Sequence, residues 1–410
     1  MAALIWVLPI VLSTLLGISL VGYLTVHPLQ MSFYIFIATV AMSALVWVLA
    51  SLFRGKKRLL AVGLSLLFFS AGYGLRTQQV FSQEDSRPVP KLTRLKGDPG
   101  DGHTAVIYIT HGEPETFNPI GWLNQFREFD QQGIAFVPWV ARPMFIFQLR
   151  QAYLQVGQSR HRQMHIQMLK QLAGAFRAEG DTSTKFYLSF LDDEPRPDAA
   201  LIQALNDGAS RIVVAEVFVS ISNHTAEGEK LIKEVHAEEL GVPVVFTSPL
   251  WDSIPLQQSF VVKLDAALDG TDKAKVGVIL VGHGQPTEWD REFPTETEHE
   301  LRFREEILKR LEADGYRMEN MGLAWMEFRE PQPAEKVEAL IMNGVEKIFF
   351  FPAAISADSI HSQYDIPELI GEAKVPAGFP LVNLGAWNDH SLVIQAIKEK
   401  IESAQKMSSQ

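Results

Sequence analysis

An internal repeat constrains the fold of this chain more than any other feature. The stretch that begins at Glu194 reads EPRPDAALIQALNDGASRI, and the one that begins at Glu330 reads EPQPAEKVEALIMNGVEKI. The two stretches lie 136 positions apart, and the same interval separates Trp251 from Trp387. A spacing shared by separate landmarks is typical of a duplicated structural unit. The chain beyond about residue 104 therefore contains two copies of one fold.

Each copy contains four short apolar runs that alternate with amphipathic stretches. Short runs rich in Val, Ile and Phe predict buried strands, and the stretches between them have helical periodicity. This alternation is typical of parallel sheets with helices on both faces. We predict an α/β fold of two duplicated, doubly wound parallel sheets, in residues 104–270 and 271–410. The predicted strands are 104–110, 185–191, 211–220, 242–248, 275–282, 321–328, 347–353 and 380–387.

The first copy is longer than the second. His111 and His224 of the first copy correspond to His283 and His361 of the second, and about 35 more residues separate the first pair. Much of this surplus falls in residues 115–150. Long insertions after strands often carry function, so we expect this one to cover a pocket.

The first 80 residues are a membrane region by composition. No Asp, Glu, Lys or Arg occurs before Arg54. Residues 3–26, 31–52 and 59–75 are three apolar runs, and about 20 such residues cross a bilayer as a helix. A cleaved signal peptide is the competing interpretation of the first run, but that run lacks a basic start. Residues 81–103 are polar and rich in Pro and Gly, which is typical of a linker.

The basic loop between the second and third runs predicts an orientation. Residues 54–58 read RGKKR, and such loops stay in the cytoplasm. The third helix would then carry everything after it to the far side of the membrane. We expect a multi-pass membrane protein whose two α/β copies are extracytoplasmic.

Composition excludes several classes of function. The chain has no cysteine, so it forms no disulfide, thiolate metal site or iron–sulfur cluster. Its net charge is −11, which argues against nucleic acid as a partner. The sequence also lacks the phosphate-binding GxxxxGK[ST] loop, GxGxxG after a strand, HExxH and GxSxG. We therefore expect no nucleotide cofactor.

Four histidines stand where predicted strands end. His111 and His283 follow the first strand of each copy, and His224 and His361 follow the third. Ligands of parallel sheets bind beyond the carboxyl ends of the strands, so each pair is expected to meet in one cleft. Neutral imidazoles bind divalent transition metals or accept protons. The alternative is that each histidine is a hydrogen-bonded loop residue. This alternative has more weight for His111 and His224 than for His283 and His361.

Acidic residues near these histidines are weaker candidates. Glu227 lies one helical turn after His224, and a solvated helix start is the alternative. Glu327 follows a predicted strand and could bind substrate or stabilise a helix start. Asp358 is a second candidate for substrate binding, or it caps the following helix. His161 and His165 have i, i+4 spacing beside two arginines, which favours a surface helix over a metal site.

Several motifs together resemble the class II chelatases, which are ferrochelatase and the ATP-independent cobalt and nickel chelatases that act on sirohydrochlorin. VGHGQP at 281–286 resembles their first-strand histidine motif. WMEFREPQP at 325–333 resembles their Glu…Pro element, and ISADSIHSQYDIP at 355–367 resembles their strand-end histidine followed by Asp-Ile-Pro. Residues 141–172 are more similar to an early helical region of ferrochelatase. The resemblance extends from about residue 105 to 406.

The resemblance implies a function and roles for individual residues. His283 falls on the catalytic histidine, and His361 falls on the second metal-binding position, where ferrochelatase has a glutamate. Glu227 falls near a glutamate that helps to bind metal in long cobalt chelatases. The implied activity is a lyase-type insertion of Co²⁺, Fe²⁺ or Ni²⁺ into a tetrapyrrole such as sirohydrochlorin or a porphyrin, as in cobalamin biosynthesis. His111 and His224 would also contact metal. The alternative function is a membrane-tethered protein that binds metal or tetrapyrrole without turnover.

Overall fold

The computed structural model of the chain describes residues 2–83, 87, 89–134 and 136–407. These residues form two compact units. One unit contains residues 1–87 together with 116–155, and the other contains residues 88–115 together with 156–410. The surplus segment of the first copy therefore belongs to the same unit as the amino-terminal helices. We call the first the helical unit and the second the α/β unit.

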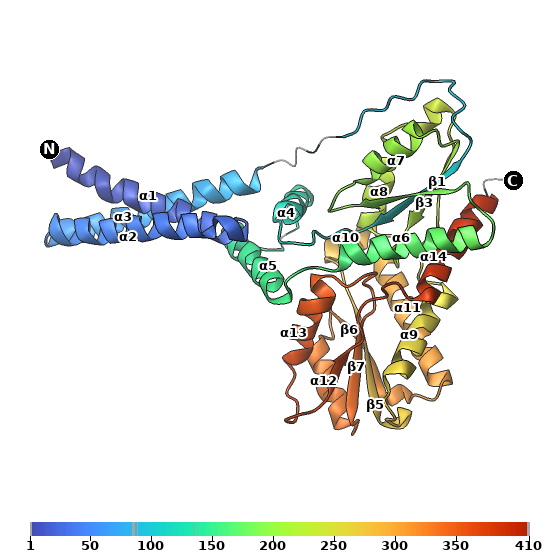
Figure 1. Cartoon of the computed structure of the whole chain (residues 1–410). Helices are drawn as coiled ribbons and strands as arrows, with labels where there is room; N and C mark the ends of the chain where they lie inside the picture. Colours follow the sequence, from blue (N-terminus) through green and yellow to red (C-terminus); the bar gives the residue numbers. More distant parts are fainter. Residues whose placement is uncertain (1, 84–86, 88, 135, 408–410) are drawn as a thin grey trace. The chain divides into compact units, whose positions relative to one another are not determined.

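Three long helices dominate the helical unit (Figure 1): α1 (Ala2–Thr25), α2 (Met31–Ser51) and α3 (Lys56–Phe81). Each is long and apolar enough to cross a membrane. The third helix is longer than the apolar run 59–75, because uncharged polar residues after Arg76 continue its helical turns. The remaining elements are η1 (Pro28–Gln30), α4 (Ile120–Gln132), η2 (Trp139–Ala141) and α5 (Arg142–Val156).

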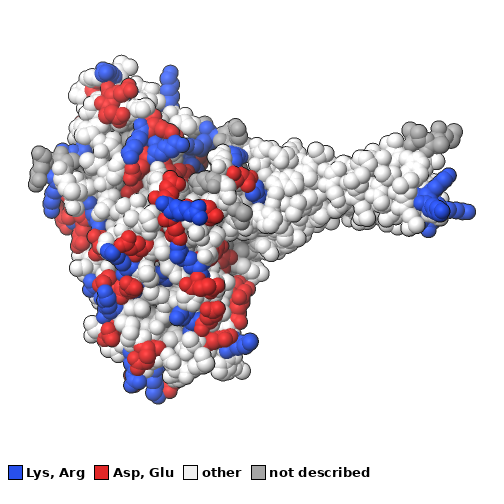
Figure 2. All heavy atoms as spheres, turned by 180° about the vertical axis from the view of Figure 1, so that it is seen from behind, with Lys and Arg blue, Asp and Glu red and all other residues white. Residues whose placement is uncertain are grey.

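Glycines allow α1 and α3 to pack with their backbones in contact. A Cβ atom on Gly17 would lie 2.2 Å from the carbonyl oxygen of Phe69, and one on Gly72 would lie 2.3 Å from that of Thr14. Small residues at such crossings are typical of helices that associate in lipid. The exposed basic residues Arg54, Lys56, Lys57 and Arg58 gather at the α2–α3 turn, and the helix surface next to this turn shows no charged side chain in the view of Figure 2.

The α/β unit contains two parallel sheets of four strands each, with orders β2-β1-β3-β4 and β6-β5-β7-β8. All eight predicted strands are present. Their bounds are β1 (Thr104–Thr110), β2 (Lys185–Phe190), β3 (Arg211–Glu216), β4 (Val244–Phe246), β5 (Val276–Gly282), β6 (Met321–Trp325), β7 (Lys347–Pro352) and β8 (Leu381–Asn383). The central strands β1 and β5 occupy equivalent places, which confirms the duplicated α/β fold.

Helices cover both faces of each sheet (Figure 1). One buried core joins the facing sides of the two sheets through α6, α9, α11 and α14, and separate cores lie on their outer faces. Helix α14 belongs to the second copy but contacts β3 and β4 of the first. The helices are α6 (His161–Ala178), α7 (Pro197–Asn206), α8 (Asn223–Lys233), α9 (Ile254–Ala267), α10 (Thr287–Glu292), α11 (Pro294–Ala313), α12 (Pro333–Met342), α13 (Ile366–Gly371) and α14 (Ser391–Met407). Short turns η3 (Ala237–Leu240), η4 (Lys273–Lys275) and η5 (Met318–Asn320) and the π-helical turn η6 (His361–Asp365) complete the unit.

Candidate functional site

The four predicted histidines meet in two pairs. His111 and His283 directly follow β1 and β5, whose neighbours β3 and β7 lead to His224 and His361. The ring centroids of His111 and His224 lie 4.6 Å apart, and those of His283 and His361 lie 5.6 Å apart. Adjacent parallel strands end at one edge of the sheet, which brings residues distant in sequence together.

A glycine after each first-strand histidine fixes the orientation of its ring. Gly112 and Gly284 have φ angles of 89° and 86°, a region that side chains other than glycine rarely adopt. A Cβ on Gly284 would also lie 2.2 Å from the carbonyl oxygen of Glu327. In this turn the glycine carbonyl lies next to the preceding imidazole, at 3.1 Å from Nδ1 of His111 and 2.7 Å from Nδ1 of His283.

That contact selects one tautomer. A carbonyl only accepts hydrogen bonds, so Nδ1 must donate and therefore carries the proton. In the neutral ring the lone pair is then on Nε2, which is left for a metal or a proton. Metal-binding histidines in proteins commonly donate their other nitrogen to a carbonyl or carboxylate in this way. Both copies thus present an imidazole of the same orientation beyond the central strand.

His283 and His361 differ in charge. Burial, and secondly the nearby His361, lower the pKa of His283 to about 4, so His283 is neutral at pH 7. Burial alone would also lower the pKa of His361, but hydrogen bonding to Asp365 and the carboxylates of Glu327 and Glu113 raise it to about 9. Nδ1 of His361 lies 2.6 Å from Oδ2 of Asp365, one turn further along η6. π-Helical turns of this kind are frequent at functional sites.

Direct contacts join the site loops of the two copies. Glu113 lies two residues after His111, and its Oε1 accepts a hydrogen bond of 2.9 Å from the N–H of Ile360, which precedes His361. Burial raises the pKa of Glu113, while a hydrogen bond with Ser159 and the nearby His361 oppose this rise. Burial lowers the pKa of His224 well below its ordinary value, and electrostatic interaction with His111 and His283 lowers it further. The four histidines therefore share one electrostatic environment.

The prediction that His161 and His165 lie on a surface helix is wrong. Their exposed fractions are 4% and 0%, because α6 packs between the two sheets. His165 contacts the hydroxyl of Tyr108 at 2.8 Å through Nδ1, and that of Ser356 at 3.1 Å through Nε2. The ring of His161 lies 4.5 Å from that of His165, and its buried Nδ1 has no hydrogen-bond partner among the residues that the structure describes. These histidines form a polar layer beneath the first-copy site.

A different polar layer lies beneath His283. Glu300 and Arg304 of α11 are buried, and Oε2 of Glu300 accepts the backbone N–H of His283 at 3.1 Å. Arg304 lies 3.9 Å from the ring centroid of Trp325 and donates to the carbonyl of Ala324 at 2.6 Å. A Cβ on Gly282 would lie 2.6 Å from Glu300 Oε2. The glycine therefore leaves the space in which this carboxylate reaches the histidine.

The weaker acidic candidates have different surroundings. Glu327 is half-buried, and burial raises its pKa while His361 opposes the rise. Glu227 forms an ion pair of 3.0 Å with Arg196 at the start of α7. Asp358 is buried, forms an ion pair with Arg160 and accepts the N–H of Ala386 at 3.0 Å. The carboxylate of Glu327 raises the pKa of His361.

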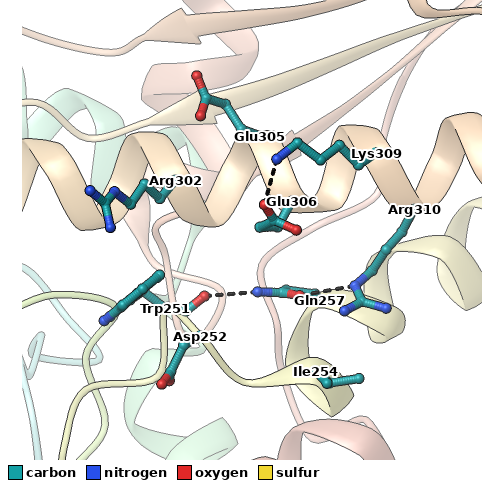
Figure 3. A pocket seen from close by; sticks show the side chains of 9 residues that line it. All are labelled: Trp251, Asp252, Ile254, Gln257, Arg302, Glu305, Glu306, Lys309 and Arg310. Atoms are coloured by element: carbon teal, nitrogen blue, oxygen red, sulfur yellow. Dashed lines mark hydrogen bonds and ion pairs between the residues drawn. The ribbon is translucent and has the colours of Figure 1, made fainter.

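Among the described residues, no three His, Asp or Glu side chains converge closely enough to hold a metal ion. A groove of about 540 Å³ lies elsewhere, between α9 and α11 (Figure 3). Trp251, Gln257 and Arg310 line it together with charged residues of α11, and it contains none of the four histidines.

Two residues of this site were missed by sequence reasoning although the motifs contain them. Glu113 is the acidic residue of HGEP, where the second copy has Gln285 in HGQP. Asp365 is the aspartate of Asp-Ile-Pro, four positions after His361, which is the spacing of neighbours on a helix. The sequence gives less indication that Glu300 and Arg304 belong to the site, since charged residues at i, i+4 spacing on a helix are usually exposed.

Comparison with known proteins identifies the family. Residues 103–405 match the family model described as Ferrochelatase. The sirohydrochlorin cobaltochelatase of Methanothermobacter thermautotrophicus is 31% identical over 106 residues, which cover 25% of this chain and 63% of that enzyme. The chain thus spans less than two thirds of this relative's length.

Solved structures show weaker similarity. SirB from Bacillus subtilis with Fe³⁺ has a TM-score of 0.47 at 13% identity, over 75% of this chain and 98% of SirB. CbiX from denitrifying bacteria has a TM-score of 0.43 at 12% identity, over 74% of this chain and 99% of CbiX. The assignment rests on the family model, which matches well over half of the sequence. The chain belongs to the ferrochelatase family.

Proposed function

We propose that this protein is a membrane-anchored, ATP-independent chelatase that inserts a divalent metal into a tetrapyrrole. The observation that carries the proposal is the pair His283 and His361, whose rings lie 5.6 Å apart and differ in protonation. Metal insertion requires one group that donates a lone pair to the metal and other groups that accept and release the N–H protons of the macrocycle. Family membership supports this chemistry over other uses of paired imidazoles.

The reaction takes up one M²⁺ and releases the two N–H protons of the macrocycle. His283 is neutral at pH 7 and offers Nε2, so it is the group that binds the metal or accepts a leaving proton. His361 is protonated at Nδ1 beside Asp365 and, while it is an imidazolium, also at Nε2. A metal that binds Nε2 would first require the Nε2 proton to leave to solvent or to a neighbouring base. Glu113 and Glu327 add negative charge that offsets the cation. His111, His224 and Glu227 are assigned a secondary role in metal binding, and Asp358 a role in shaping the loop before His361.

Co²⁺ and sirohydrochlorin are the substrates to test first. The curated relative with 31% identity is a sirohydrochlorin cobaltochelatase, and His361 stands where the resemblance to ferrochelatase would place a glutamate. Imidazole is a good ligand for Co²⁺, Ni²⁺ and Fe²⁺ alike. Porphyrins with Fe²⁺ or Ni²⁺ are therefore the comparison substrates.

Helices α1, α2 and α3 are proposed to anchor the enzyme in a bilayer, with the α/β unit outside the cytoplasm. Their length, their apolar composition and the basic α2–α3 turn support this orientation. A reporter fused after Gln410 tests it. Activity of a cytoplasm-dependent reporter there would reverse the proposed side.

The decisive experiment measures turnover by the full-length protein in lipid nanodiscs. Each metal is mixed with sirohydrochlorin or a porphyrin, without oxygen for Fe²⁺, and the absorbance of the metallated product is followed. We expect multiple turnovers without ATP, and none from a His283→Ala variant. Stoichiometric binding without turnover would instead support the non-catalytic alternative.

A further inference from the structure

The helical unit contains a segment from inside the first α/β copy. Residues 116–155 leave the α/β unit after Glu115 and return before Ser159, where the N–H of Ser159 donates to the carbonyl of Glu115 at 3.0 Å. Within the helical unit this segment packs against α1 and α3. Phe126 of α4 meets Phe81 at the end of α3, with ring centroids 5.6 Å apart.

A buried arginine ties the segment to α1. Arg150 of α5 is 0% exposed, and its Nη1 donates to the carbonyls of Tyr23 at 2.7 Å and Val26 at 2.8 Å. These carbonyls belong to the carboxyl end of α1, where backbone oxygens lack helical partners and the helix dipole is negative. The guanidinium also lies over the rings of Tyr23 and Phe147. Helix α5 therefore caps the end of an apolar helix.

The turn before α5 contacts α3 at a defined depth. The hydroxyl of Tyr73 donates to the carbonyl of Val140 at 2.7 Å, and the space beside Gly74 is filled by Trp139. At a rise of about 1.5 Å per residue, Tyr73 lies roughly 26 Å along α3 from Lys56. A hydrocarbon core is about 30 Å thick, so this contact falls close to its far boundary. Tyr23, Tyr34 and Trp139 accompany Tyr73 at this end, as expected of an aromatic belt at an interface.

The described surface of this part of the segment carries no charged side chain, and its turn exposes apolar side chains. Between Gly133 and Gln155 the charged residues are Arg142 and Arg150, and both are buried. Arg142 pairs with Asp130 at 2.7 Å and lies over the ring of Phe126. By contrast, Val140 is 62% exposed and Met144 is 48% exposed. An exposed apolar turn beside apolar helices fits a lipid partner.

We propose that the turn formed by residues 138–144 is inserted into the interface of the bilayer, on the side opposite the basic α2–α3 turn, and binds lipid there. This inference rests on the proposed membrane anchoring. It adds that a segment of the first α/β copy, and not only the amino-terminal helices, contacts the bilayer. The partner is the boundary between lipid headgroups and acyl chains.

The cysteine-free chain allows a direct test with single thiols. Val140→Cys and Met144→Cys are labelled with a nitroxide in the full-length protein, in nanodiscs of phosphatidylcholine and phosphatidylglycerol. Spin relaxation by oxygen and by a water-soluble nickel chelate gives the depth of each label. Leu66→Cys in α3 is the reference within a span, and Ile254→Cys and Met342→Cys, which replace exposed apolar residues of the α/β unit, are references for water.

We expect the labels at 140 and 144 to lie about 5–10 Å below the headgroup boundary. Labels at 140 and 144 that behave like those at 254 and 342, while Leu66→Cys remains in lipid, would overturn the proposal and leave the anchoring intact. A water-exposed label at 66 would overturn both. Unchanged thermal unfolding of each variant shows that the label has not disrupted the fold.

Discussion

Glu113 of the first copy accepts a hydrogen bond of 2.9 Å from the backbone N–H of Ile360 in the second, although 247 positions separate them. The contact joins the loop after His111 to the loop before His361. It is made by a carboxylate with a raised pKa, which also faces the charge of His361. The two copies are therefore joined at the site itself as well as through their core.

Replacing Glu113 tests this link. Glu113→Ala should lower the free energy of unfolding by about 1–3 kcal/mol, because it leaves a buried backbone N–H without an acceptor. It should also slow metal insertion, because the loop that carries His361 loses a constraint. Glu113→Gln keeps an acceptor oxygen and should restore stability while the loss of charge lowers metal affinity. Equal insertion rates in all three proteins would contradict a functional role for this contact.

Alanine variants of the histidines compare how much each copy contributes to metal insertion. His283→Ala and His361→Ala should abolish insertion with little loss of stability, since both residues are only half-buried at the ends of their strands' connections. His111→Ala should have a much smaller effect, with His224→Ala and Glu227→Ala between them through weaker metal binding. Insertion rate, metal affinity and thermal unfolding are measured for all five. Loss of activity only in the first-copy variants would show that the active copy has been misassigned.

Gly282 tests the support beneath His283. A Cβ at this position would lie 2.5 Å from Cζ of Arg304 and 2.6 Å from Oε2 of Glu300. Gly282→Ala should therefore destabilise the protein by about 1–3 kcal/mol through overpacking. Gly174→Ala in α6 is the matched control, because outside the helix's own backbone no atom of the described residues lies within 4 Å of its added Cβ, and alanine favours helices by about 1 kcal/mol. Chemical denaturation that found the two variants equally stable would contradict the packing described here.

Glu216 should make stability depend on pH. Burial, and secondly the charge of Glu229, raise the pKa of this carboxyl from 4.5 to about 8. Below pH 4.5 both folded and unfolded chains hold the proton. As the pH rises towards 8, the unfolded chain loses its proton first, so the folded state loses stability over this range. Glu216→Gln removes the titration and should unfold at a higher temperature than the native protein at pH 8.5, but not at pH 5.

The melting temperature across this range is the measurement. Glu368→Gln alters an exposed carboxylate of α13 and should leave the pH profile unchanged. Identical profiles for the native protein and Glu216→Gln would show that the Glu216 carboxyl ionises freely in the folded state.

The fold was largely predictable because strand runs and repeat spacing are local signals. The third strand was predicted to reach residue 220 but ends at Glu216, since Val217 to Ser220 are as apolar as a strand yet leave the sheet towards His224. Periodicity measures burial and does not report where backbone pairing stops. The sequence therefore predicts poorly where a strand such as β3 ends when the residues that follow it lead into a site.

The surroundings of the histidines depended on contacts between distant segments. His165 looked exposed because arginines flank the start of its helix, yet Ser356 of the other copy covers it. The charge of His361 likewise depends on Glu113 and Glu327, which no local pattern connects to it. Strand ends predicted which imidazoles are near one another, whereas tertiary packing decides which of them holds a proton.

The hydrogen bond between Ser159 and Glu115 closes the point at which residues 116–155 leave the α/β unit. A closed stem allows the loop beyond it to be lengthened, shortened or exchanged without altering the ladder between β1 and its neighbours, which runs unbroken from Thr104 to Thr110. The corresponding connection of the second copy, through α10, is shorter. Duplication thus provides two equivalent strand ends, of which one carries a helical insertion and the other carries only a short connection.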